Sequence, residues 1–186
     1  MKYLIIGLGN IGEEYEATRH NIGFMALDYL IEEFNSNFTL DKLAFKAEIK
    51  HKGRSIHLIK PTTYMNLSGK SVNYWMQQLS IPKEKILVVV DDIALPFAKI
   101  RMRTKGSSAG HNGLKNIEDL TGGQNYSRLK VGIGDDFPKG QQVKYVLERF
   151  NEKEFEEMPF LLDKINKVIL SFCIIGPGRT MNEFND

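Results

Sequence analysis

Cysteine, tryptophan and histidine are scarce in this sequence, and long apolar runs are missing altogether. Its 186 residues include one cysteine, one tryptophan and four histidines. One thiol forms no internal disulfide, which agrees with a reducing cytoplasm, and the apolar neighbours of Cys173 predict that it is buried. No segment approaches the roughly 18 apolar residues of a membrane span, and the first residues reach glycine too early for a secretory signal peptide. We therefore expect a cytoplasmic protein with no membrane partner.

An excess of charge of either sign is missing as well. The sequence has 25 Lys and Arg against 23 Asp and Glu, so its formal net charge is only +2. Binding to a nucleic acid would therefore have to come from a local basic patch. Hydrophobic residues make up 42% of the chain, which is enough for one full core, and no repeat or long linker divides it. We expect residues 1–186 to form a single domain.

Short apolar runs alternate along the chain with amphipathic segments. The short runs predict strands at residues 3–8, 45–50, 55–60, 85–91, 99–105 and 128–134. Apolar residues spaced three or four apart predict helices at residues 21–34, 66–79, 112–120 and 152–174. Pro159 is expected near the start of the last helix, where a missing N–H costs little. This order predicts the α/β class, with a twisted, mixed and mostly parallel sheet, helices on both faces and one hairpin.

His20 is the strongest candidate for a catalytic group. It stands between Arg19 and Asn21, whose side chains could orient a substrate, and an imidazole can take a proton from water near neutral pH. Asp91 ends a buried strand, so we expect its carboxylate to meet His20 at the sheet edge and hold the ring in one tautomer. No serine, threonine or cysteine is a persuasive nucleophile, so the base would act on water. The alternative is that His20 is a satisfied polar residue at a helix start.

Three asparagines stand in equally special places, namely Asn10 in the first glycine-rich turn, Asn66 before a predicted helix, and Asn112 between glycines. Each amide offers donors and an acceptor without charge, which suits binding peptide groups or a developing oxyanion. Asn10 and Asn112 could instead be present because asparagine tolerates left-handed backbone. Asn66 could be the cap of the helix over residues 66–79.

A basic strand supplies a candidate surface for phosphate. Alternation over residues 99–105 places four cations on one strand face, and two further cations follow on a later strand; the six are Lys99, Arg101, Arg103, Lys105, Arg128 and Lys130. Such a row would follow a phosphate backbone well. The alternative is a solvated edge strand that its charges protect from aggregation.

Three other readings of the sequence are less favourable. The G-x-G-x-x-G pattern at residues 7–12 is followed by Glu13 and Glu14, where a dinucleotide would place its phosphates, and no second strand follows. The G-x-S-x-G pattern at residues 106–110 follows a charged strand, and the one later histidine is His111, only three residues beyond Ser108. No ligand spacing supports a metal site, so no metal is expected.

Several candidates lie within longer motifs whose order and spacing are specific. These motifs are Gly7-Leu-Gly-Asn10, Tyr15-x-x-Thr-Arg-His20-Asn21-x-Gly23, Lys60-Pro-x-Thr-Tyr-Met65-Asn66-x-Ser-Gly69, Asp91-Asp92-x-x-Leu95-Pro96, Gly106-Ser-x-x-Gly110-His111-Asn112-Gly113-Leu-Lys and Arg128-Leu-Lys-Val-Gly132-Ile-Gly134. Together they resemble the bacterial-type peptidyl-tRNA hydrolases. The resemblance implies a monomeric esterase, without metal or organic cofactor, that cuts peptides from the 3′ ribose of tRNA.

The resemblance also implies a role for each matching residue. His20 would be the catalytic base and Asp91 its orienting acid, while the peptide and the attacked carbonyl would be held by Asn10, Tyr15, Tyr64, Met65, Asn66, His111 and Asn112. The tRNA phosphates would contact Arg101, Arg103, Lys105, Arg128 and Lys130, with Arg103 and a partner near residues 128–130 as the main pair.

Two positions depart from the family pattern. Ile11 replaces a proline, which predicts a looser Asn10, and Ala94 stands where an acid is common. The competing class is a non-catalytic module that binds tRNA or peptide.

Overall fold

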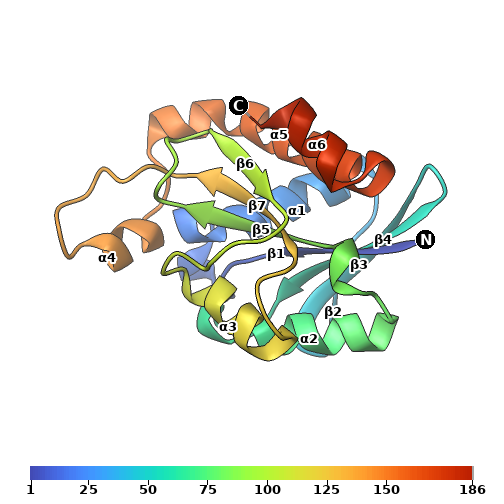
Figure 1. Cartoon of the computed structure of the whole chain (residues 1–186). Helices are drawn as coiled ribbons and strands as arrows, with labels where there is room; N and C mark the ends of the chain where they lie inside the picture. Colours follow the sequence, from blue (N-terminus) through green and yellow to red (C-terminus); the bar gives the residue numbers. More distant parts are fainter. Residues whose placement is uncertain (186) are drawn as a thin grey trace.

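The computed structural model describes residues 1–185, and a seven-stranded sheet lies at its centre (Figure 1). The strands are β1 (Lys2–Gly7), β2 (Thr39–Asp41), β3 (Ala44–His51), β4 (Arg54–Pro61), β5 (Ile86–Asp92), β6 (Ile100–Arg103) and β7 (Ser127–Gly132). Their order across the sheet is β2-β3-β4-β1-β5-β7-β6. The four inner strands from β4 to β7 run parallel, whereas β2, β3 and β6 are antiparallel to their neighbours. The predicted mixed sheet and the predicted hairpin β3–β4 are confirmed.

Helices cover both faces of the sheet, as predicted (Figure 1). One face packs against α1 (Ile22–Glu33) and α5 (Glu152–Ile175), with α6 (Pro177–Phe184) beside α5. The other face packs against α2 (Ser68–Leu79) and α3 (Asn112–Thr121), and their apolar side chains form a second core with Leu4, Ile6 and Val88. A short helix, α4 (Gln142–Leu147), projects beyond the ends of β5 and β7. No helix within residues 1–185 is long and apolar enough to cross a bilayer.

The long helix α5 begins where the sequence predicts, but Pro159 lies deeper in the helix than expected. The side-chain oxygen of Asn151 accepts a hydrogen bond from the N–H of Glu154 at 2.9 Å, and the N–H of Asn151 donates to the Glu154 carboxylate at 3.2 Å, which fixes the first turn. Pro159 lies inside the helix, beyond this first turn, so the expectation that its missing N–H falls among the unpaired N–H groups of the helix start is wrong.

A close backbone contact fixes the start of α1. A Cβ atom on Gly23 would lie 2.4 Å from the nitrogen of Leu8 and 2.6 Å from the carbonyl oxygen of Val89. Only glycine allows this approach, so the first turn of α1 lies directly on β1 and β5. The 3-10 helix η2 (Arg19–Asn21) precedes α1 and is thereby held over the carboxyl end of β5.

The outer edge of β6 is covered by a side chain from the C-terminal segment. The oxygen of the Asn185 amide accepts a hydrogen bond from the N–H of Met102 at 2.8 Å, and its nitrogen donates to the Met102 carbonyl at 3.0 Å. This pair of bonds imitates the contact of a neighbouring strand. The exposed edge of the sheet is therefore partly closed at its middle.

Candidate active site

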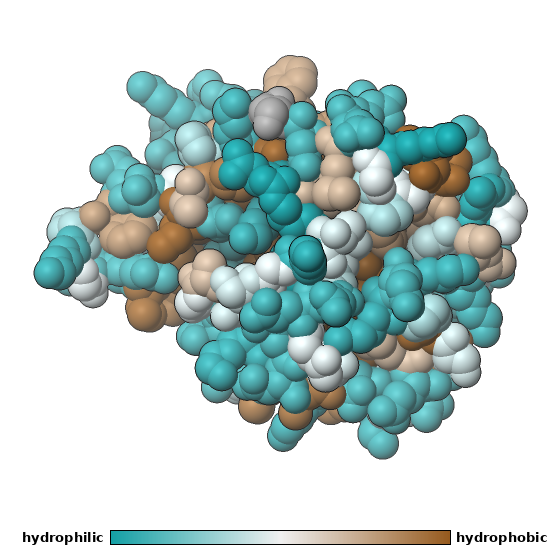
Figure 2. Space-filling view, viewed as in Figure 1, coloured by the Kyte–Doolittle hydropathy of each residue, from teal (hydrophilic) through white to brown (hydrophobic). Residues whose placement is uncertain are grey.

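A cavity of about 330 Å³ opens at the carboxyl end of β5. Its walls come from the end of β5, from the segments around residues 64–66 and 108–112, and from α4; they include Asn10, His20, Tyr64, Met65, Asn66, Asp91, His111, Asn112, Lys130 and Val143. Figure 2 shows a mainly hydrophilic face with hydrophobic side chains gathered around α4, at the left. Open α/β sheets bind their ligands at this end of the strands.

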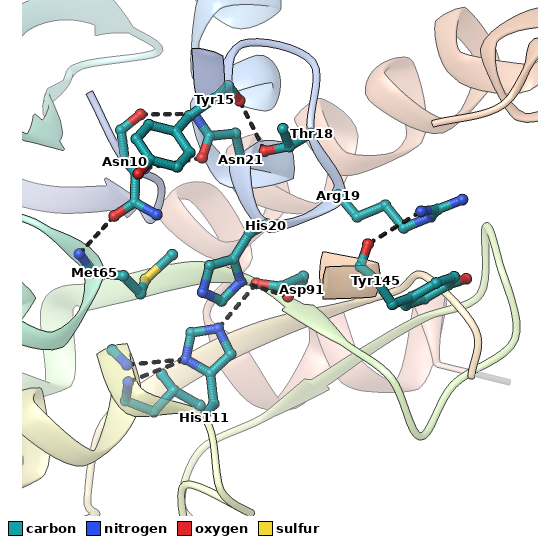
Figure 3. Close-up of polar contacts among 12 residues, drawn as sticks. Asn10, Tyr15, Thr18, Arg19, His20, Asn21, Met65, Asp91, His111 and Tyr145 are labelled. Carbon is teal, nitrogen blue, oxygen red and sulfur yellow. Dashed lines mark hydrogen bonds and ion pairs between the residues drawn. The ribbon is translucent and has the colours of Figure 1, made fainter. Parts of the chain in front are cut away.

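His20 and Asp91 form the polar centre of the cavity (Figure 3). The Nδ1 atom of His20 lies 2.8 Å from Oδ2 of Asp91, so the expected contact is present. Nδ1 therefore carries the proton of the neutral ring and donates it to the carboxylate, which leaves Nε2 as a free acceptor. Within residues 1–185, Nε2 of His20 forms no hydrogen bond.

The electrostatics of this pair favour a charged carboxylate and a basic ring. Burial lowers the pKa of His20, but the charge of Asp91 and its hydrogen bond raise it by more, so the net pKa lies above the ordinary value of 6.5. Burial alone would raise the pKa of Asp91, which is only 5% exposed, yet the two histidines beside it hold that pKa well below its usual range. Asp91 is therefore ionised at neutral pH.

Asp91 also accepts a hydrogen bond from His111, a contact that the sequence did not predict. The Nε2 atom of His111 lies 2.9 Å from Oδ1 of Asp91. The Nδ1 atom of His111 accepts from the N–H groups of Gly113 and Leu114 at the start of α3, at 3.1 and 3.4 Å. This acceptor role leaves a proton on Nε2, which donates to the carboxylate and orients it from its second side.

Asn10 reaches the cavity because Asn21 holds its backbone. The N–H of Asn10 donates to Oδ1 of Asn21 at 2.9 Å, and Nδ2 of Asn21 donates to the carbonyl of Asn10 at 2.8 Å. The side-chain oxygen of Asn10 accepts from the N–H of Met65 at 2.8 Å, which leaves its amide nitrogen as the free donor (Figure 3). Asn10 is thus held on three atoms, and a looser turn caused by Ile11 stays a prediction.

The other two asparagines present their amides at the mouth of the cavity. Asn66 lies in the 3-10 helix η3 (Met65–Leu67), and α2 begins only at Ser68, so Asn66 is not the cap of that helix. Asn112 is the first residue of α3. Neither Asn10 nor Asn112 has a positive φ, so tolerance of left-handed backbone does not explain either residue.

Tyr15 and Arg19 both lie near His20, but the structure places them differently from the other expected site residues. Tyr15 ends the 3-10 helix η1 (Glu13–Tyr15) and does not line the cavity; its carbonyl accepts from the hydroxyl of Thr18. Arg19 is buried with its guanidinium over the Tyr145 ring, 4.0 Å from the centroid, and donates to the Tyr145 carbonyl at 3.1 Å. The expectation that Arg19 orients a substrate is therefore wrong, whereas a contact of Tyr15 with the substrate stays a prediction.

The basic residues separate into exposed and buried ones. Arg101 and Arg103 alternate with the buried Ile100 and Met102 along β6, as predicted, whereas Lys99 and Lys105 lie just outside the strand. Lys130 pairs with Arg101 across the sheet and lines the cavity, with its ammonium 3.8 Å from Asp92.

Arg128 contradicts the expectation of a phosphate contact. Its side chain is 0% exposed, its guanidinium lies over the Tyr126 ring, and it donates to the carbonyls of Gly106, Gln124 and Tyr126. A group enclosed in this way cannot meet a phosphate at the surface.

The facing atoms of His20, Asp91 and His111 lie within 4.8 Å of one another, a spacing that could also suit a metal ion. The spacing argument against a metal, made from sequence, therefore does not hold in three dimensions. The contacts still favour hydrogen bonds, because each facing ring nitrogen lies 2.8–2.9 Å from the carboxylate and His111 must carry its proton there. That no metal is needed stays a prediction.

Comparisons with known proteins agree with this geometry. The family model for peptidyl-tRNA hydrolase matches residues 4–186. The chain is 57% identical to a peptidyl-tRNA hydrolase of Cytophaga hutchinsonii, covering 100% of this chain and 98% of that protein, and 53% identical to one of Parabacteroides distasonis, covering 100% of both. The crystal structure of peptidyl-tRNA hydrolase from Acinetobacter baumannii superposes with a TM-score of 0.92 at 32% identity, covering 98% of this chain and 94% of that one. The chain therefore belongs to the peptidyl-tRNA hydrolase family.

Proposed function

We propose that this protein hydrolyses the ester bond between a peptide, or an N-blocked aminoacyl group, and the 3′ ribose of tRNA. The observation that carries the proposal is the 2.8 Å contact between His20 and Asp91 beside an open cavity, in a chain that belongs to this family. The product would be free tRNA, recovered from peptidyl-tRNA that ribosomes release too early.

In the proposed reaction, Nε2 of His20 takes a proton from a water molecule as the water oxygen attacks the ester carbonyl carbon. Asp91 stabilises the imidazolium that forms, and His111 holds Asp91 in place. The free amide nitrogen of Asn10 is a suitable donor to the oxyanion. When the tetrahedral intermediate collapses, the bond to the ribose oxygen breaks and the imidazolium returns its proton to that oxygen.

The peptide would lie along the remaining wall of the cavity. The amides of Asn66 and Asn112 can pair with peptide N–H and carbonyl groups without adding charge. Tyr64, which is 58% exposed, and Met65 offer apolar contact on one side, and Val143 of α4 offers it on the other. Contacts to backbone groups combined with general apolar surface would accept many peptide sequences.

The tRNA would meet the basic residues in and next to β6 and β7 that are exposed or half-buried. Arg101, Arg103, Lys105 and Lys130 lie on this side of the cavity or next to it, and a formal net charge of +2 means that the attraction is local. We propose that the protein acts as a monomer in the cytoplasm, where its substrate is made, and needs neither metal nor organic cofactor.

The test is to follow ester loss from N-blocked aminoacyl-tRNA with wild type, His20→Ala and His51→Ala. A general base contributes about 10²–10⁴ in rate, so His20→Ala should lose at least about a hundredfold in kcat/KM while still binding tRNA. His51 lies in the β3–β4 hairpin, against the Phe34 ring and away from the cavity, so its loss is the matched control. Binding of tRNA without turnover in the wild type would contradict the proposal, as would a loss under tenfold in His20→Ala.

A further inference from the structure

Arg128 places a whole guanidinium inside the protein, where such a group is costly unless its donors are paired. One terminal nitrogen donates to the carbonyl of Gly106 at 2.7 Å and lies 3.5 Å from the carboxylate of Glu118. The other donates to the carbonyls of Gln124 and Tyr126 at 2.6 and 3.2 Å. One side chain thus binds three separate carbonyls, so it holds backbone segments together and has no terminal nitrogen left without a partner for a ligand.

The carbonyls that Arg128 binds belong to two different segments. Gln124 and Tyr126 lie in the turn between α3 and β7, and Glu118 lies on α3 itself. Gly106 belongs to the loop of residues 104–110, which connects β6 to His111. Arg128 therefore joins this loop to the body of the protein.

The loop of residues 104–110 has few other attachments. Within residues 1–185, the bond from Arg128 to Gly106 is the one hydrogen bond that reaches it from a distant element. Three of its residues have positive φ, namely Gly106 at 145°, Ala109 at 49° and Gly110 at 84°. The two glycines adopt such φ values without strain, whereas Ala109 needs its surroundings to hold it there.

The same loop carries groups that the proposed function needs. Ser108, Ala109 and Gly110 line the cavity, and Lys105 is one of the proposed phosphate contacts. His111, at the end of the loop, is held independently by α3 and Asp91. Loss of the hydrogen bond from Arg128 to the loop should therefore disturb substrate binding more than the chemistry at His20.

We propose that Arg128 is a positioning residue that fixes the loop of residues 104–110, and with it the tRNA-facing wall of the cavity, without touching the substrate. The part that concerns tRNA rests on the proposed function. The part that concerns the loop does not.

The experiment compares wild type with Arg128→Lys, Gly106→Ala and Arg103→Ala. Arg128→Lys keeps the charge but loses the fork that binds three carbonyls. Gly106→Ala attacks the other end of the contact, because a Cβ there meets no atom within 4 Å but the φ of 145° is strained for alanine. It thus perturbs the loop without emptying the buried site, even where Arg128→Lys fails to fold. Arg103→Ala removes an exposed cation and serves as the comparison for direct phosphate contact.

Amide hydrogen exchange over residues 104–110 should become about tenfold faster in Arg128→Lys and Gly106→Ala, while exchange in β1 and α1 stays unchanged. With N-blocked aminoacyl-tRNA, both variants should raise KM about tenfold, keep kcat within about threefold and retain the wild-type salt dependence. Arg103→Ala should instead leave the loop exchange unchanged and reduce the salt slope by about 0.7–0.9.

Unchanged loop exchange in both loop variants would overturn the proposal. Faster exchange with an unchanged KM would overturn its tRNA part. A wild type without esterase activity would refute the proposed function alone, because the exchange measurement does not depend on turnover.

Discussion

Asp91→Asn tests the central contact of the site most directly. The carboxylate offers two acceptor oxygens, and both are used, one by His20 at 2.8 Å and one by His111 at 2.9 Å. An asparagine offers one oxygen and one N–H donor group, so one of the two rings must face a donor. If that ring is His20, its Nδ1 becomes the acceptor and the proton moves to Nε2, where a base is required.

Two effects on catalysis follow from this substitution. The plateau of kcat/KM should fall by about 10²–10⁴, because the correct tautomer and the stabilised imidazolium are both lost. The pH dependence should shift as well. In the wild type, the rate should rise with pH as the imidazole loses its proton, with a midpoint above 6.5, since the Asp91 charge outweighs burial. Without the charge, burial remains and lowers the pKa of His20, so the midpoint should move to lower pH.

The assay is a profile of kcat/KM for N-blocked aminoacyl-tRNA from about pH 5 to pH 9, which reports the pKa of the free enzyme. Asp92→Asn is the matched control, since it removes the same charge one residue away, where the carboxylate binds the N–H of Ala94 and lies near Lys130. A midpoint that stays in place or rises in Asp91→Asn would refute the tautomer argument, as would an equal shift in the control.

Two further substitutions test how the site is supported. Asn21→Ala should lower stability by about 2–3 kcal/mol and reduce kcat/KM, because both buried hydrogen bonds to the Asn10 backbone are lost; chemical denaturation measures the first effect, and an unchanged free energy of unfolding would contradict this reasoning. Gly23→Ala should cost about 3 kcal/mol, or about 6–12 °C in Tm, because its Cβ would meet backbone atoms at 2.4 and 2.6 Å. Gly178→Ala, with nothing within 4 Å, is the control for the second substitution, and an equal Tm for both alanine variants would contradict the packing argument.

Much of the fold could be predicted because its inner elements have strong local patterns. The run at residues 86–90 and the hairpin around Gly53 both became strands, and the long apolar period of α5 became a helix. The short outer elements were missed: β2 has three exposed residues, and α4 places Val143 at 71% exposure. Neither has the periodic apolar face on which sequence arguments depend.

Of the two contacts that Asp91 makes, the sequence predicted the one with His20 and missed the one with His111. The contact of His20 with Asp91 follows from a histidine after a glycine-rich turn and an acid at a strand end. The second contact, from His111, depends on how α3 sits against β5, and no local pattern encodes that arrangement. A histidine immediately before a helix, able to accept from its first N–H groups, was the available indication.

Arg128 shows why strand alternation alone cannot separate surface from interior. The two-residue period correctly places Arg128 and Lys130 on the same face of β7. However, β7 is an inner strand, and the turn before it covers one end of that face while the cavity opens at the other. Arg128 is therefore buried, whereas Lys130 lines the cavity, although the sequence pattern treats them alike.

The amide of Asn185 against Met102 has a consequence for how this molecule meets copies of itself. β6 is the outermost strand, and an outermost strand with free backbone groups can pair with a strand of another molecule. The Asn185 amide occupies the backbone N–H and carbonyl of Met102 at the middle of this edge. A strand of another molecule could therefore not form a complete set of backbone hydrogen bonds with β6, whereas the side chains of Arg101 and Arg103 are not covered by this contact. The basic side chains of β6 thus stay available for the proposed tRNA contact, while pairing of this edge with another strand is disfavoured.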